Sequence, residues 1–212
     1  MRYLGVEFFG ALLTSMDSSE DVTSLSATIA LLSIVIKTVD KGILQSKFSI
    51  SAKLLLELLS QHGQGDDASI VRGLLGCLSV LLRAQDPDGW RRSETVKVMD
   101  SILTFVVDRR PKVRKAAHHA VCVILVSKDE SSMQDFHPIA EHTAKSLIIF
   151  MESNAGNVGS DIKGALHIMT LLKEILHTFP KLQVKSTCET ILKLMTLHSG
   201  MSNWHYAIVC NM

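Results

Sequence analysis

Residues 108–125 read DRRPKVRKAAHHAVCVIL, and this stretch decides the fold. Asp108 is suited to accept hydrogen bonds from the unpaired N–H groups that open a helix, and Pro111 suits a first helical turn, where its missing N–H costs nothing. From Val113 onward, apolar residues recur at steps of three and four, the period of one helical face. The stretch therefore predicts a turn followed by an amphipathic helix, with small alanines that permit close helix packing.

The same stretch resembles the inter-helix turn and second helix of a HEAT repeat. HEAT proteins commonly carry an Asp in this turn and an Arg in the following helix, and the two bridge neighbouring repeats as a ladder. The resemblance implies that Asp108 and Arg114 form such a ladder beside Val113. It also implies that the helix before the turn and the helix after it form one hairpin.

The rest of the chain carries the same helical pattern. Apolar residues make up 47% of the chain but aromatic residues only 5%, and this mainly aliphatic composition favours packed helices over strands. Alternate helices start roughly 44 to 50 residues apart, close to the period of HEAT and armadillo repeats. About nine helices are expected, near residues 3–15, 20–39, 43–61, 66–84, 93–107, 110–127, 136–152, 160–178 and 181–197.

The predicted fold class is therefore all-α, a HEAT/armadillo-type α-solenoid of about four helical hairpins plus a half repeat. Residues 1–198 form the predicted repeat segment. The end, SGMSNWHYAIVCNM at 199–212, begins where a partner for the last helix should start and is interpreted as a divergent C-terminal tail. The apolar start of the chain is expected to be a buried first helix rather than a signal peptide, because Glu7 interrupts it.

One local cluster of positive charge stands out from a nearly neutral chain. The formal net charge of +1 excludes a uniformly basic nucleic-acid binder, so any such role needs a local patch. The chain offers one such cluster: Arg109, Arg110, Lys112, Arg114 and Lys115. Three interpretations stay open: a solvated helix start with one ladder arginine, a contact for RNA phosphates or an acidic partner, and a nuclear-targeting signal. Aromatic residues do not interleave these cations, which disfavours base stacking.

Enzyme chemistry has no support among the motifs. His118 and His119 are adjacent and point about 100° apart on a helix, so they are poorly placed to share a metal ion. The chain also lacks the HExxH, CxxC and GxSxG patterns. We therefore expect a protein that is not an enzyme, with no cofactor, no metal, no small-molecule substrate and no membrane span.

Four stretches carry a further resemblance, in this order: RPKVRKAAHHAVCVIL (110–125), HPIAEHTAKSLI (137–148), LHIMTLLKEILHTFP (166–180) and VKSTCETILKLMTL (184–197). Together with weaker echoes from residue 8 onward, they resemble the ribosomal-RNA-processing protein twelve family, which are large nucleolar HEAT-repeat proteins. The resemblance implies a scaffold in ribosome biogenesis, located in the nucleus and nucleolus. Because family members are several times longer, it also implies that this chain is a fragment or a shortened form.

Partners follow from the same resemblance. It implies pre-rRNA, pre-ribosomal assembly factors and the Ran GTPase export machinery, with roles in pre-rRNA processing, assembly and nuclear export of subunit precursors. The alternative is an adaptor solenoid of the transport-receptor or trafficking type that binds only proteins, which the near-neutral charge also fits. The two differ in their expected response to salt, because phosphate neutralisation gives a steep dependence.

Overall fold

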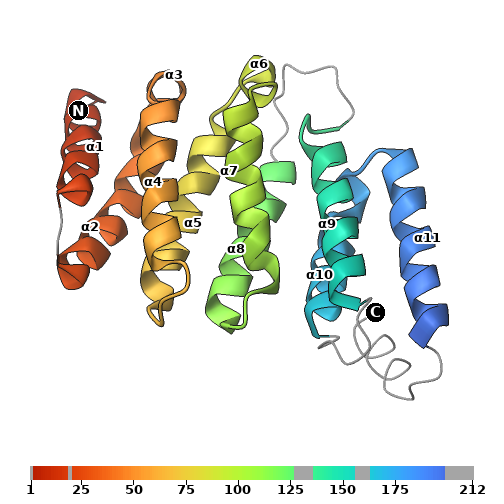
Figure 1. Ribbon diagram of the computed structural model, residues 1–212. Helices are drawn as coiled ribbons and strands as arrows, with labels where there is room; N and C mark the ends of the chain where they lie inside the picture. Colours follow the sequence, from red (N-terminus) through yellow and green to blue (C-terminus); the bar gives the residue numbers. More distant parts are fainter. Residues whose placement is uncertain (1, 19–20, 127–135, 156–162, 199–212) are drawn as a thin grey trace. The chain divides into compact units, whose positions relative to one another are not determined.

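The computed structural model describes residues 2–18, 21–126, 136–155 and 163–198. All regular secondary structure in these residues is helical, with eleven α-helices and three 3-10 helices (Figure 1). This confirms the predicted all-α class. The chain divides into two compact units, residues 1–124 and residues 125–212, and each is described by itself.

The first unit contains three long hairpins and two short helices. Its elements are α1 (Arg2–Asp17), α2 (Val22–Val35), η1 (Ile36–Thr38), α3 (Lys41–Ser46), α4 (Phe48–His62), α5 (Ala68–Arg83), α6 (Pro87–Trp90), α7 (Ser93–Leu103), η2 (Thr104–Val107) and α8 (Pro111–Val126), whose last two residues cross the boundary. The hairpins are α1–α2, α4–α5 and α7–α8.

An aspartate precedes the second helix of each of these hairpins. The carboxylate of Asp21 accepts from the N–H of Ser24 at 2.8 Å, and that of Asp67 accepts from the N–H of Ser69 at 2.8 Å. Asp108 lies three residues before α8, and its carboxylate accepts from the N–H of Arg110 at 2.8 Å instead. The carboxylates of Asp21 and Asp67 each satisfy an N–H that the first helical turn leaves unpaired and interact favourably with the positive end of the helix dipole.

The hairpins stack in two layers within the first unit. Helices α1, α4 and α7 lie side by side, while α2, α5 and α8 form the other row (Figure 1). The core between the rows is aliphatic and fully buried, with Leu32, Leu55 and Leu74 at 0% exposure. Polar contacts also join successive repeats: the Gln45 side-chain amide donates to the Ala84 carbonyl at 2.9 Å.

Two short helices depart from the expected boundaries. The helix expected over 43–61 is divided at Lys47 (φ −98°, ψ 4°) into α3 and α4. Between the helices expected over 66–84 and 93–107 lies the additional short helix α6, where the carboxylate of Asp86 accepts from the Gly89 N–H at 2.6 Å and Pro87 takes the first turn. Both short helices precede the first helix of the next hairpin, so the departure itself repeats with the period of the fold.

The second unit contains α9 (Ala140–Ala155), α10 (Lys163–Ile175), η3 (Leu176–Thr178) and α11 (Lys181–His198). Helix α9 packs against both α10 and α11. Its core includes Leu147, Ile168 and Leu171, all at 0% exposure. One hairpin plus a single helix agrees with the expected count of about four hairpins and a half repeat.

The facing of α11 differs from its apolar pattern. Val184, Cys188, Ile191 and Met195 recur at helical spacing, yet Cys188 is exposed, and the helix instead buries Gln183, Thr187 and Leu194. The Thr187 hydroxyl donates to the backbone carbonyl of Gln183 at 2.7 Å, and this bond satisfies the hydroxyl within the buried contact. The predicted tail at 199–212 lies outside the described residues.

Candidate functional site

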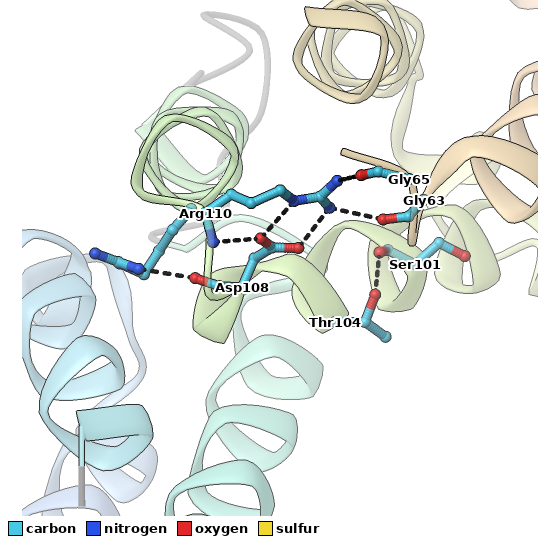
Figure 2. Close-up of polar contacts among 7 residues, drawn as sticks. Gly63, Gly65, Ser101, Thr104, Asp108 and Arg110 are labelled. Atoms are coloured by element: carbon cyan, nitrogen blue, oxygen red, sulfur yellow. Dashed lines mark hydrogen bonds and ion pairs between the residues drawn. The ribbon is translucent and has the colours of Figure 1, made fainter. Parts of the chain in front are cut away.

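The turn before α8 holds an aspartate and an arginine in one closed arrangement (Figure 2). Arg110 donates to the carboxylate of Asp108 through Nε at 2.9 Å, through Nη2 at 2.8 Å and through its backbone N–H at 2.8 Å. Both side chains are largely buried, at 15% and 13% exposure. The bidentate geometry matches the planar guanidinium to the planar carboxylate, which makes this a strong ion pair.

Arg110 also joins two repeats. Its Nη2 donates to the Gly63 carbonyl at 2.6 Å, and its Nη1 donates to the Gly65 carbonyl. Both carbonyls belong to the connection between α4 and α5, one hairpin earlier in the chain (Figure 2). The guanidinium therefore satisfies backbone acceptors of one repeat while its carboxylate partner belongs to the next.

The pKa values of the pair follow from these contacts. Burial acts to raise the pKa of Asp108, but the hydrogen bonds and positive charge of Arg110 outweigh it and hold that pKa below its ordinary value. The hydrogen bond to Asp108 raises the pKa of Arg110, against the opposing effect of burial. Both groups stay charged at neutral pH, and the positive charge of Arg110 is paired with the carboxylate of Asp108.

The other predicted ladder residues lie close by. Arg114 donates through Nη1 to the backbone carbonyl of Asp108 at 2.7 Å, a contact within its own turn. Val113 is fully buried in the first unit at 0% exposure. Among these residues it is Arg110 that contacts the preceding repeat. Arg114 instead stabilises its own turn.

The five clustered cations do not share one surface. Arg110 and Arg114 are half-buried in the turn, whereas Arg109, Lys112 and Lys115 are exposed. Of these three, Lys112 and Lys115 line a groove of about 800 Å³, and Arg109 does not. The cluster is therefore divided by the helix start into a structural part and a part that faces solvent.

This groove runs across the second helices of the three hairpins, α2, α5 and α8, and we call it the basic groove. Five cations line it: Lys37, Arg72, Arg83, Lys112 and Lys115. His119 joins them, and the lining contains no Asp or Glu. All six side chains are exposed. Such a surface attracts anions, although the whole chain is nearly neutral.

The lining residues hold equivalent positions in successive repeats. Ser26, Arg72 and Lys115 are each the fifth residue of α2, α5 and α8. Ala30, Gly76 and His119 hold the ninth position, and all six residues line the basic groove. Arg83 ends α5 at its sixteenth residue, and Lys37 stands at the same count from the start of α2. These positions form one stripe of each helix, because they are separated by three to four residues or multiples of that step.

Two glycines of α5 shape the floor of the basic groove. A Cβ on Gly73 would lie 2.3 Å from Cγ2 of Ile29, so this glycine lets α2 and α5 approach closely. A Cβ on Gly76 would meet nothing within 4 Å. Gly76 is therefore not required by packing, and its missing side chain leaves the floor open.

Sequence reasoning missed Lys37, Arg72 and Arg83 as members of the site. They lie one or two repeats before the cation cluster and stand alone in apolar helices, so local charge density does not mark them. Aligning α5 and α8 on their first helical residues, Ala68 and Pro111, places Arg72 and Lys115 in register.

Among the residues that the structure describes, no three His, Cys, Asp or Glu side chains lie close enough together to hold a metal ion. Nε2 of His118 lies 3.0 Å from the Val106 carbonyl, which is a structural contact between α8 and the end of its hairpin partner. Among the described helices, none is long and apolar enough to cross a membrane.

Comparisons with known proteins agree with this architecture. The family model described as RRP12-like, N-terminal HEAT repeats, matches residues 2–207. The chain is 38% identical over 193 residues to the RRP12-like protein of Homo sapiens and 30% identical over 208 residues to that of Drosophila melanogaster, with 90% of this chain covered in each case. It is 26% identical over 210 residues to Ribosomal RNA-processing protein 12 of Saccharomyces cerevisiae. The chain spans about 15% of the length of these relatives.

Proposed function

The chain belongs to the RRP12-like family, whose N-terminal HEAT repeats it contains, and from this membership we propose that it acts in ribosomal RNA processing during ribosome biogenesis. The observation that carries the proposal is the match of the HEAT-repeat model over residues 2–207 together with the name of the yeast relative. HEAT repeats supply extended binding surfaces, which suits a scaffold.

The proposed mode of action is non-enzymatic association with pre-ribosomal particles. Its partners are pre-rRNA and assembly factors, its location is the nucleus and nucleolus, and the Ran GTPase export machinery is a further proposed partner during nuclear export. The basic groove supports this role, because its five exposed cations attract a partner that carries negative charge.

A second candidate is an adaptor that binds only proteins, of the transport-receptor or trafficking type. The observation in its favour is the lining of the basic groove, which offers a base only the ring of His119 to stack on. The two candidates differ in whether pre-rRNA accompanies the chain.

Co-purification of the tagged chain from cell lysate, with and without RNase, tests the proposal. We expect pre-rRNA and assembly factors to be recovered, and we expect a Lys112→Ser/Lys115→Ser variant to recover less of both. Arg110 and Arg114 are left intact in this variant, because their hydrogen bonds stabilise the turn. Recovery of other proteins without pre-rRNA or assembly factors contradicts the ribosomal role and favours the adaptor.

A further inference from the structure

We propose that the basic groove binds an extended acidic protein segment in which carboxylates about five residues apart are separated by small aliphatic side chains. The inference rests on the proposed scaffold role and names the class of partner for one of its surfaces. It is carried by three features of the groove: unpaired positive charge, an aliphatic floor and the spacing of the cations along α5.

The charge of the basic groove is not balanced by the protein itself. Lys37, Arg72, Arg83, Lys112 and Lys115 are all exposed, and within the described residues none of them forms an ion pair with a carboxylate. By contrast, Lys53, Arg91, Lys145 and Lys185 all pair with a carboxylate on their own helix or in its adjoining turn. Cations held together without internal partners repel one another, and an anionic ligand relieves that repulsion.

The floor between these cations is aliphatic. Ala30, Val80, Ala116 and Val123 line the groove beside the open Gly76, and His119 supplies the one aromatic ring of a lining without Phe, Tyr, Trp or Met. Single-stranded RNA gains much of its binding energy from bases stacked on aromatic rings. Small aliphatic side chains gain theirs from contact with a surface of this kind. The floor therefore favours a peptide over an RNA strand.

The spacing of the cations matches an extended chain. Arg72 and Arg83 are the fifth and sixteenth residues of α5 and so lie about 16 Å apart along the helix axis at 1.5 Å per residue. An extended peptide covers that distance in about five residues at 3.3 Å each. Between the two arginines the residues of α5 that line the groove carry no charge, and they are Gly73, Gly76, Ser79 and Val80. The expected segment carries acidic residues about five apart with Ala or Val between them.

The test measures fluorescence anisotropy of three labelled probes with the full chain. The first is a 14-residue peptide in which pairs of adjacent Glu residues recur every five positions and Ala and Val fill the rest. The second is the same peptide with Gln in place of Glu, and the third is a 14-nucleotide oligouridylate. We expect saturable binding of the Glu peptide, no binding of the Gln peptide, and weaker binding of the oligouridylate.

A matched pair of charge variants locates the binding. We expect Arg72→Ser/Arg83→Ser to weaken Glu-peptide affinity about tenfold. The control Lys97→Ser/Arg109→Ser removes the same charge from exposed residues outside the groove and is expected to leave the affinity unchanged. Gly76→Leu keeps the charge but fills the floor, where a Cβ meets nothing within 4 Å, and is also expected to weaken binding.

Three results would overturn the inference. One is oligouridylate binding tighter than the Glu peptide and lost in Arg72→Ser/Arg83→Ser, which makes the groove an RNA surface. The others are equal effects of the two double variants, and full affinity in Gly76→Leu. None of these touches the proposed function, which fails only if the chain does not recover pre-ribosomal components from lysate.

Discussion

A single arginine among five neighbouring cations carries the structural contact between repeats. Arg110 donates to the Asp108 carboxylate and to the carbonyls of Gly63 and Gly65, whereas Arg109, its direct neighbour, is exposed. The difference arises from the backbone, because the turn before α8 aims residue 110 at the preceding repeat. A charge cluster in a sequence therefore says little about which of its members bind a partner.

Arg110→Ala should destabilise the first unit by about 2–4 kcal/mol, because it leaves the buried Asp108 carboxylate and two backbone carbonyls without their donor. Arg109→Ala should change the free energy of unfolding by less than about 0.5 kcal/mol, since that side chain is exposed. Urea denaturation of both variants measures the difference. Equal stabilities would show that the bridge across the repeats does not contribute.

A buried histidine gives the second unit a dependence on pH. Burial lowers the pKa of His137 to about 4 from its ordinary 6.5, and its Nδ1 accepts from the Ile139 N–H at 3.3 Å beside the start of α9. The unfolded chain takes up a proton as pH falls through 6.5, while the folded chain does so only near pH 4. The stability from neutral His137 is thus complete above pH 6.5 and is lost between pH 6.5 and 4.

His137→Asn removes this titration while keeping a side-chain acceptor for the same N–H. We expect the variant to lose less stability than the parent when the pH is lowered from 7 to 4.5. Hydrogen exchange of the α9 amides at both pH values measures the change in stability of the second unit. An identical loss in parent and variant would assign the acid sensitivity to other groups.

At the scale of one residue, the sequence predicted the local chemistry of the turn better than its long-range contacts. Pro111 lies in the first turn of α8 as expected, while the carboxylate of Asp108 accepts from the N–H of Arg110 just before the helix and not from an N–H within it. The bond from Arg110 to Gly63 joins residues 47 apart in the chain. A local pattern does not specify such a distant partner, and the identity of the bridging arginine therefore needed the structure.

The helix is the scale at which the basic groove arises. Each of α2, α5 and α8 has one stripe that packs into the core and a second stripe that lines the groove, and the groove stripes carry small residues and cations. The small residues leave open space in the middle of the groove, and the cations lie toward the ends of the helices. The surface depends on the register between repeats, and the caps Asp21 and Asp67 help to fix where α2 and α5 begin.

Two glycines of α5 should respond oppositely to alanine. Gly76→Ala should stabilise the first unit by about 0.5–1 kcal/mol, because it raises helix propensity and its Cβ enters open space. Gly73→Ala should destabilise it by about 1–3 kcal/mol, because its Cβ would lie 2.3 Å from the buried Ile29 side chain. Thermal unfolding of both variants checks the pair. A destabilising Gly76→Ala would mean that the floor is not open.

Most helices could be predicted from apolar spacing, and their departures have physical causes. Helix α5 matches the expected 66–84 closely because its apolar stripe is wide and Asp67 marks its start. The division between α3 and α4 escaped prediction, since apolar spacing continues through Lys47. For α11 the spacing predicted the helix but not its buried face, because Thr187 enters the contact by bonding to its own backbone.

At the scale of the whole molecule, net charge conceals the charge distribution. The formal charge of +1 arises from 22 basic and 21 acidic residues, yet the lining of the basic groove contains only basic ones. Several acids have roles elsewhere, as helix caps at Asp21 and Asp67, as the partner of Arg110 at Asp108, and as partners of surface lysines. A nearly neutral chain thus presents a strongly positive surface at the basic groove.

Membership of the RRP12-like family supports the proposed role of this chain in ribosome biogenesis. The chain covers about 15% of the length of its relatives, so its partners are proposed from one part of a larger architecture. The HEAT-repeat fold was predictable from the segment 108–125 and from the order of the resembling stretches. The basic groove was not, because its cations come from three different repeats.

The most direct test is sucrose-gradient sedimentation of nuclear extract containing the tagged chain, its Arg72→Ser/Arg83→Ser variant or the control Lys97→Ser/Arg109→Ser. We predict that the parent and the control sediment with pre-ribosomal particles, marked by pre-rRNA in the same fractions. The groove variant should shift toward the free-protein fractions at the top of the gradient. A parent chain found only at the top, or two variants that sediment alike, would contradict the account.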